Sequence, residues 1–482
     1  MNRSNFNWGS GPRLLLAAFL MNCLASCAVG PDYKQPTVPM SAHWRSSTEF
    51  QQAQPDDDKI RGNWWEMFGD AQLNQLEAQA LEHNQNWVAA AEHLNQARLQ
   101  VDATASIQLP AVDAVASDAR TKTSADHPFG AYSGNNVSFV QNNPQLGMAV
   151  SYEADLFGRV RRLVESASAL AEQADADFEN TQLLLTSDLA SNYVNLCESD
   201  QEINILEHSV ILQEKSVDFI RIRHDLNYAT GLDLAQQQAL LESNQAQLAL
   251  LQRQRAALQY AIATLIGVPA PDVKLVTPIK PLTMPTMPVA LPSELLQRRP
   301  DVASAERAVA AANANIGLAK AAYYPSIMLQ AGDGWSSAQW SNLISAPSIL
   351  WSLGATVTEH IFDNGKNAAY EKIAESLYTS AVAKYRQSVL VAMQEVQTGV
   401  DSMVWLTTAN TKAQSSVVSA EKAFSIANDR YKGGLDIYLN VIAAQQTLLA
   451  NQRQAAQIEG QQMLNAVYLV KALGGGWQGL GK

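Results

Sequence analysis

Two segments of the chain alternate between apolar and small or polar residues, which is the pattern of a β-strand with two different faces. In 349–358, one face would carry Ile349, Trp351, Leu353, Ala355 and Val357, and the other Ser352, Gly354, Thr356 and Thr358. The segment 146–152 alternates in the same way. We therefore predict strands at 145–155 and 349–358, with weaker strand signals near 111–120 and 326–331.

A second pattern, apolar residues at every seventh position, predicts very long helices. In the first half of the chain it comprises Leu189, Leu196, Ile203, Val210 and Val217. No glycine or proline occurs from residue 159 to residue 230, so one helix can span this segment and would be roughly 100 Å long. Another helix is predicted from Gly231 to about Ile266. A spacing of 3.5 residues per turn lets neighbouring helices stay in contact over such distances.

The same order of elements occurs twice. The second heptad series comprises Val389, Val396, Met403, Val417 and Phe424, with Asn410 interrupting, and it superposes on the first with a shift of 207 residues. Each half is predicted to run helix, strand, strand, long helix, turn, helix. The first helices lie at roughly 65–107, before Pro110, and near 300–322, before Pro325. This predicts a mainly α protein with a small β part, built from an internal two-fold repeat.

The four strands fit two environments. Alternation is expected of a strand with one face in lipid and one in water, but a soluble sheet with one buried face would have the same pattern. Four strands cannot close a barrel, because closure needs about eight or more. If the strands enter a membrane, several protomers must share one barrel, because unpaired backbone groups in lipid are costly. A free-standing coiled-coil stalk would explain the helices but not the strand pairs.

The N-terminus has the features of an export signal. Arg3 and Arg13 precede a short apolar run, and residues 24–27 read Leu-Ala-Ser-Cys. This ending is similar to a bacterial lipoprotein signal, so we expect cleavage after residue 26, lipidation of Cys27 and, because Ala28 follows, the outer membrane. An ordinary signal peptide with a chance cysteine is the alternative. Cys197 is then left without a disulfide partner, and we expect a buried thiol.

Composition excludes several functions. The formal charge of -12 argues against a nucleic-acid partner. Beyond the N-terminus no stretch of 18 apolar residues predicts a transmembrane helix. The chain has no His-Glu-x-x-His, Gly-x-Ser-x-Gly or phosphate-binding glycine motif, so we expect neither an enzyme nor a cofactor or metal site.

Several motifs together resemble one known family, the lipoprotein branch (NodT-like) of the outer membrane factors, which are the TolC-type channels of bacterial efflux pumps. The resemblance covers nearly the whole mature chain. The segments that carry it are 27–33, 63–65, 151–159, 298–301, 312–317, 361–363 and 472–477, which read CAVGPDY, NWW, SYEADLFGR, RRPD, ANANIG, IFD and ALGGGW.

The resemblance implies a homotrimer with a β-barrel of twelve strands in the outer membrane and a tunnel of twelve helices through the periplasm. It implies a passive exit duct for small molecules or drugs, docked to a periplasmic adaptor protein and an inner-membrane transporter. The family closes the periplasmic end of the tunnel with its two helix-turn-helix tips. The exported substrates do not follow from this sequence, because the inner-membrane partner selects them.

The resemblance places the candidate gate at 223–233 and 430–440. The candidate residues there are Arg223, Asn227, Gly231, Asp233, Arg430, Tyr431, Gly434, Asp436 and Asn440. Asn227 and Gly434 lie where the chain must reverse. The sequence departs from the family at Asn440 and Ala443, where carboxylates are expected. Asp233 and Asp436 remain candidates for an acidic ring, with ordinary solvated turn aspartates as the alternative. Another local alignment would pair 231–233 with 434–436.

The expected organisation is a lipoprotein signal (1–26), an N-terminal anchor and equatorial segment (27–64), a first repeat (65–270), a linker (271–291), a second repeat (292–473) and a C-terminal tail (474–482). Two other functions are open at this point. The same fold could serve a type I protein secretion system. A protein of another class, a periplasmic coiled-coil adaptor or structural lipoprotein, would not conduct ions.

Overall fold

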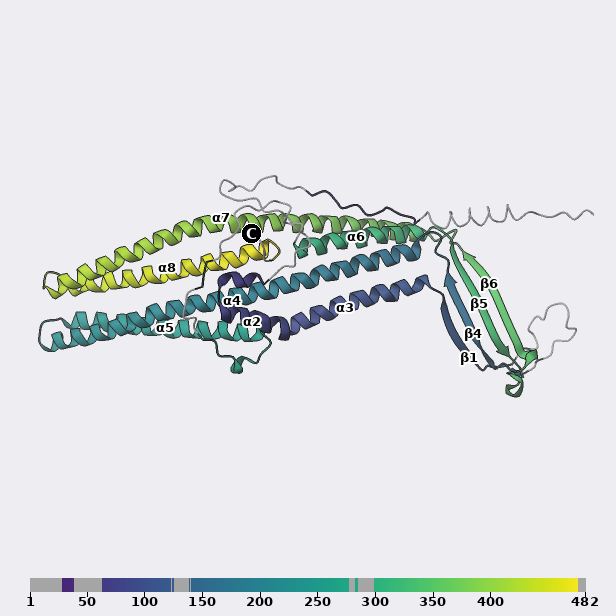
Figure 1. Cartoon of the computed structure of the whole chain (residues 1–482), viewed down its shortest axis with the longest axis horizontal. Coiled ribbons are helices and arrows are strands. Elements are labelled where there is room, and N and C mark those ends of the chain that lie inside the picture. Colours follow the sequence, from purple (N-terminus) through teal and green to yellow (C-terminus); the bar gives the residue numbers. More distant parts are fainter. Residues whose placement is uncertain are drawn as a thin grey trace, which may run out of the picture. The chain divides into compact units, whose positions relative to one another are not determined.

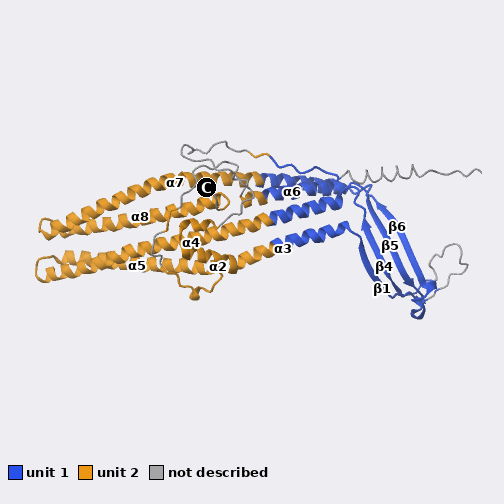
Figure 2. Cartoon of the chain, viewed as in Figure 1, with its two compact units in different colours: residues 1–36, 94–174, 305–384 blue, residues 37–93, 175–304, 385–482 orange. Residues whose placement is uncertain are grey.

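The computed structural model describes residues 28–38, 63–122, 124, 138, 140–276, 282–284 and 299–475. The chain folds into two units, drawn in different colours in Figure 2. Unit 1 takes its described residues from 1–36, 94–174 and 305–384, and unit 2 from 37–93, 175–304 and 385–482. The predicted signal segment and Cys27 lie outside the described residues.

Unit 1 contains an antiparallel four-stranded sheet. Its strands are β1 (Ala111–Ser117), β4 (Gln145–Glu153), β5 (Ser326–Ser336) and β6 (Ile349–Thr358), in the order β1-β4-β5-β6 (Figure 1). All four predicted strands are confirmed, and β5 is longer than expected. A short pair, β2 (Arg120–Lys122) with β3 (Val140–Asn142), was not predicted. Within the described residues β1 and β6 each pair on one side, so both edges of the sheet are free.

The strand register places the apolar side chains on one face of the sheet. Val112, Val150, Ala331 and Leu353 form one cross-strand row, and the next row on that face ends at Trp351. This second row contains Asp333, a charged exception between Met148 and Trp351. The opposite face carries small and polar residues, as in the row of Asp113, Ala149, Gly332 and Ser352. Leu353 and Trp351 are largely exposed in the single chain, so the apolar face is uncovered.

The N-terminal segment 28–33 is held against unit 1 by a buried arginine. Arg162 is 4% exposed; its Nε donates to the carbonyl of Val29 (3.2 Å) and its Nη2 to Asp32 Oδ1 (3.0 Å). Asn313 Nδ2 donates to the carbonyl of Pro31 at 2.9 Å. These bonds fix the chain that follows Cys27 beside the first turn of the long helix that begins at residue 159.

Four long helices have matched lengths. Helices α4 (Arg159–Asp225) and α7 (Lys366–Lys432) each have 67 residues, and α5 (Gly231–Leu265) and α8 (Tyr438–Ala472) each have 35. Every boundary in the second pair of elements lies 207 positions after its counterpart in the first. The second half also contains α6 (Pro300–Ala321). The predicted helix segments are confirmed here, with α4 ending at Asp225 rather than continuing to residue 230.

The prediction of one continuous helix over 65–107 is wrong, because the helical segment is interrupted twice. The segment forms a 3₁₀ helix, η2 (Trp64–Phe68), then α2 (Ala71–His83) and α3 (Gln85–Ala105). Gly69 has a φ of 66°, and Asp70 caps α2 by accepting a hydrogen bond from Leu73 N at 2.8 Å. Asn84 accepts from Trp87 N at 3.0 Å. Each of these side chains accepts a hydrogen bond from a backbone N–H at the start of the helix that follows. One helix therefore ends and the next begins at Asp70 and again at Asn84.

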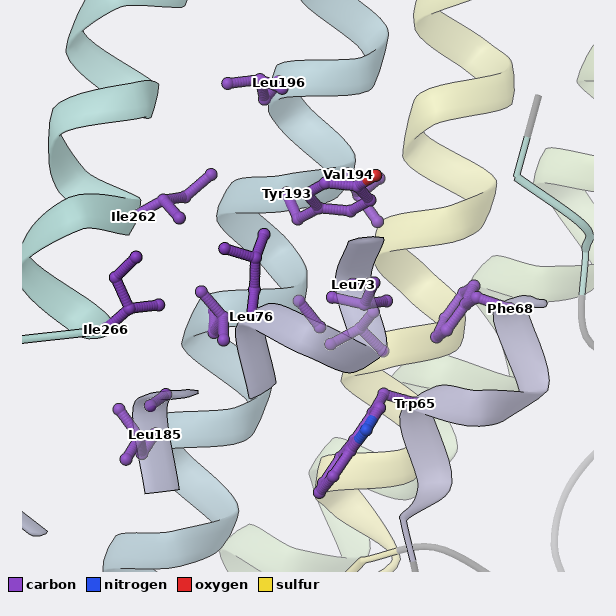
Figure 3. Packing of buried hydrophobic residues seen from close by; sticks show 14 of the residues in the cluster. Trp65, Phe68, Leu73, Leu76, Leu185, Tyr193, Val194, Leu196, Ile262 and Ile266 are labelled. Carbon is purple, nitrogen blue, oxygen red and sulfur yellow. The ribbon is translucent and has the colours of Figure 1, made fainter. Parts of the chain in front are cut away.

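The largest core cluster of unit 2 packs η2 and α2 against α4, α5 and α8. Figure 3 shows Leu73 and Leu76 of α2 near Tyr193 of α4, with Trp65 and Phe68 of η2 farther from that ring, and Ile262 and Ile266 at the end of α5 approach from another side. Glu77 of α2 is 0% exposed, and both its carboxylate oxygens lack a hydrogen-bond partner among the described residues.

Cys197 packs against the same core, and burial raises the pKa of its thiol to about 12. Its exposure is intermediate, so the thiol that was expected to be buried is only partly buried in the single chain.

Among the described residues, no helix is both long and apolar enough to cross a membrane.

Candidate functional site

The first candidate turn, residues 223–233, joins α4 to α5 in unit 2. The carbonyl of Arg223 accepts from Tyr228 N at 2.6 Å, and Asn227 takes a left-handed φ of 62°. Thr230 and Asp233 then form a reciprocal capping box at the start of α5. Asp233 Oδ2 accepts from Thr230 N (3.0 Å) and Oγ1 (2.8 Å). The carboxylate of Asp233 is therefore engaged with the start of its own helix.

The second turn, residues 430–440, repeats this backbone conformation between α7 and α8. The carbonyl of Arg430 accepts from Leu435 N at 2.9 Å, and Gly434 has a φ of 71°. Asn227 and Gly434 are thus equivalent, while Gly231 is not among the residues with positive φ. This supports the shift of 207 over the alternative pairing of 231–233 with 434–436.

The second turn has different side-chain chemistry. Asp436 accepts from Asn440 Nδ2 (2.6 Å), Ile437 N (2.9 Å) and Arg430 Nε (3.2 Å). These bonds, with Asn440 first, lower the pKa of Asp436 below its usual value. Asp436 is therefore ionised at neutral pH and paired with Arg430, and Asn440 holds that carboxylate in place.

The structure brings the two turns together through aromatic residues. The guanidinium of Arg223 lies over the ring of Tyr431 at 5.0 Å, and Tyr431 contacts Tyr438 at a centroid distance of 4.9 Å. The hydroxyl of Tyr438 donates to Oε1 of Gln237 on α5 at 3.0 Å. Gln237 is 0% exposed. These contacts connect the two hairpins just before their ends by a cation-π interaction and a buried hydrogen bond.

Two buried tyrosines and the carboxylate of Asp233 determine the electrostatics of this junction. Burial raises the pKa of Tyr438 to about 12, and it also raises the pKa of Tyr431. The charge of Asp233 contributes to both shifts, so Asp233 lies near these rings. Unlike Asp436, Asp233 has no cationic partner among the described residues. Tyr438 lies in the predicted second turn, but sequence reasoning missed its partner Gln237. It also missed the Thr230-x-x-Asp233 capping pattern, which the sequence does display.

Several apolar side chains of both turns are exposed beside polar and charged ones. Leu226, Tyr228 and Leu232 of the first turn are exposed, as are Leu435 and Ile437 of the second. Within the described residues, no group of His, Cys, Asp or Glu side chains is arranged to hold a metal ion. The site therefore combines a connected pair of turns with an exposed surface of mixed apolar and charged side chains.

A protein-family model described as outer membrane efflux protein matches residues 76–268 and 291–475, which is most of the chain. The chain belongs to the outer membrane efflux protein family. Each of the two matched segments contains two strands of the four-stranded sheet, one 67-residue helix and one of the two turns.

Curated and solved members of the efflux family are similar along nearly their whole length. The solvent efflux pump outer membrane protein SrpC of Pseudomonas putida is 33% identical over 469 residues, covering 96% of this chain and 98% of that protein. The outer membrane protein OprJ of Pseudomonas aeruginosa is 29% identical over 459 residues, with 94% of both chains covered. The structure of the outer-membrane channel OprN superposes with a TM-score of 0.85 at 29% identity, covering 94% of this chain and 100% of that one.

This efflux protein is accordingly an outer-membrane component of an efflux pump, and its family is one of channels rather than enzymes. The mainly helical fold with a small sheet is that of outer-membrane efflux channels. The resemblance to the outer membrane factors is confirmed, and the alternative of a coiled-coil adaptor or structural lipoprotein is not supported.

Proposed function

We propose that the protein is a passive trimeric exit duct, which completes a tripartite pump with a periplasmic adaptor and an inner-membrane transporter. The free edges of the four-stranded sheet carry this proposal. Three protomers with four strands each would supply twelve strands, enough to close a barrel and to pair every edge. The uncovered apolar face would then contact outer-membrane lipid, while the polar face would line water.

The helices support a matching tunnel built from an internal two-fold repeat. The equal lengths of α4 and α7, and of α5 and α8, at a constant offset of 207 positions are expected of two copies of one unit. The proposed repeats are 65–270 and 292–473, joined by 271–291 and flanked by 27–64 and 474–482. In each protomer α4 and α7 would form two full-length elements of the tunnel wall, and two pairs of shorter helices, α3 with α5 and α6 with α8, would each form one more. Three protomers would then supply twelve.

The proposed anchor is a lipid on Cys27, after removal of 1–26. The docked segment that begins at Ala28 supports it, because Arg162 and Asn313 hold the chain directly after the cysteine. Labelled palmitate should be incorporated into the wild type and not into Cys27→Ser. Equal labelling of the variant would contradict the anchor.

We propose that the two turns form the periplasmic gate. Three copies of Asp233 would make an acidic ring with uncompensated charge, whereas the charge of Asp436 is offset by Arg430. Asp233 is therefore the stronger candidate. Asp233→Ala should reduce channel block by multivalent cations, whereas Glu207→Ala, an exposed change on α4 outside both turns, should not. Equal block in all three proteins would place Asp233 away from the conducting path.

The transported molecules are proposed to be small and largely apolar. Relatives named for solvent, toluene and antibiotic efflux support this class. Deleting the gene in the native host should raise the accumulation of an apolar fluorescent dye, and complementation should restore its export. Unchanged dye accumulation together with lost secretion of a protein would favour the type I secretion alternative.

Native mass spectrometry of the purified protein should give three times the mass of the processed chain.

A further inference from the structure

Helix α4 presents two glutamates, one turn apart, toward α8 in unit 2. Glu202 is buried, and both of its oxygens have partners. Arg453 Nε donates to Oε2 at 3.0 Å, and Gln457 Nε2 donates to Oε1 at 2.7 Å. Glu202 is thus a fixed, ionised member of the α4–α8 contact.

Glu198 lies against the backbone of α8 at Gly460. A Cβ added to Gly460 would lie 2.8 Å from Cγ and 3.0 Å from Oε2 of Glu198, closer than such atoms approach. The glutamate therefore occupies the space that the missing side chain leaves. Among the described residues no hydrogen bond or ion pair is found for its carboxyl group.

The surroundings of Glu198 disfavour its charge. Burial, and then the charge of Glu202, raise the pKa of Glu198 to about 7. Other charged groups near this level of the α4, α5 and α8 helices already have partners: Arg453 with Glu202, Arg255 with Asp200, and Glu459 with Gln201. The two arginines at this level are thus engaged elsewhere, and within the part of the chain that the structure describes Glu198 forms no ion pair.

We propose that the contact of Glu198 with Gly460 is a proton-dependent clasp between α4 and α8, closed while Glu198 is protonated and loosened when it ionises. An ionised carboxylate needs hydration, and one turn from Glu202 it is also repelled. Glu198 is only partly buried, so on ionising it can turn away from Gly460 toward water. The contribution of this contact to stability is full below the usual pKa of 4.5 and is lost as the pH rises through about 7.

The clasp regulates how readily the duct opens. This part of the inference rests on the proposed function. Helices α4 and α8 belong to different hairpins, and the two turns that we propose as the gate close through contacts between those hairpins. A looser α4–α8 contact lets the turns separate more readily. We therefore expect the duct to open more readily on the alkaline side of neutrality than on the acidic side.

The first experiment measures conductance of the purified, full-length protein in planar bilayers from pH 5.5 to 8.5. The wild type should show a sigmoidal increase in open probability centred near pH 7. Glu198→Gln should stay at the acidic value throughout, because the amide cannot ionise. Glu207→Gln, an exposed change on the same helix, should follow the wild type. A pH-independent wild type, or a Glu198→Gln variant with the wild-type curve, would overturn the clasp; no conductance in any protein would instead overturn the duct.

Hydrogen exchange gives a readout that does not depend on channel activity. Amides of α8 around Gly460 should exchange several-fold faster in the wild type than in Glu198→Gln at pH 8, and equally at pH 5.5. Gly460→Ala, which displaces the Glu198 side chain, should exchange fast at both values. Equal exchange in wild type and Glu198→Gln at pH 8 would refute the clasp even if the duct conducts.

Discussion

Replacing Glu77 with glutamine should stabilise the protein at neutral pH, although it alters a completely buried side chain. Burial alone raises the pKa of Glu77 from its usual 4.5 to about 9, and neither of its oxygens has a partner among the described residues. The folded protein therefore holds a neutral carboxylic acid, whereas the unfolded chain ionises. The resulting stability is intact below pH 4.5 and is lost progressively as the pH rises toward 9.

The size of the effect follows from that shift. Each pH unit above 4.5 costs the wild type about 1.4 kcal/mol of unfolding free energy. The loss reaches about 3 kcal/mol at pH 7 and about 6 kcal/mol above pH 9. Glu77→Gln has nearly the same shape and remains neutral, so it escapes this loss. The variant and the wild type should be similar near pH 4.5 and diverge as the pH rises.

Denaturant unfolding in detergent can test this, because Trp64 and Trp65 belong to the same cluster and report its disruption by fluorescence. The midpoints of wild type and Glu77→Gln would be compared from pH 4.5 to 8.5. Glu82→Gln is the matched control, since this glutamate lies on the same helix with its side chain 73% exposed. Parallel curves for wild type and Glu77→Gln would refute a buried neutral carboxyl group at this position.

Two further predictions concern the turns. Tyr438→Phe leaves the buried Oε1 of Gln237 without its donor and should lower the unfolding free energy by about 1–3 kcal/mol, whereas Tyr228→Phe, 73% exposed, should not; equal denaturant midpoints in the two variants would contradict this. Thr230→Ala removes the capping box with Asp233 and should cost about 1 kcal/mol, seen as faster hydrogen exchange in the first turn of α5. Unchanged protection there would argue against the cap.

The sequence predicts the regular elements well because their patterns are local. Strand β6 occurs at its predicted bounds, since ten alternating residues match a pleated strand and no helix. The absence of glycine and proline after residue 158 predicts α4. Its last turn differs because Asn227 adopts a left-handed conformation, which ends the helix early. The breaks at Asp70 and Asn84 were missed because both lie within an otherwise helical pattern.

The candidate site is predicted less completely, because its contacts join residues about two hundred positions apart. The sequence predicts the positions of both turns and the chain reversals at Asn227 and Gly434. The stacking of Arg223 on Tyr431 depends on how the two hairpins pack, which no local pattern encodes. The pairing of Asp436 with Arg430 likewise depends on the turn conformation.

Single-channel recording of the purified, full-length protein in planar bilayers tests the central claim most directly. If three protomers share one barrel and one tunnel, a preparation of heat-modifiable trimers should produce discrete ion-conducting events. Heating to dissociate the trimers before reconstitution should abolish those events. Intact trimers that insert into the bilayer and never conduct would contradict the account.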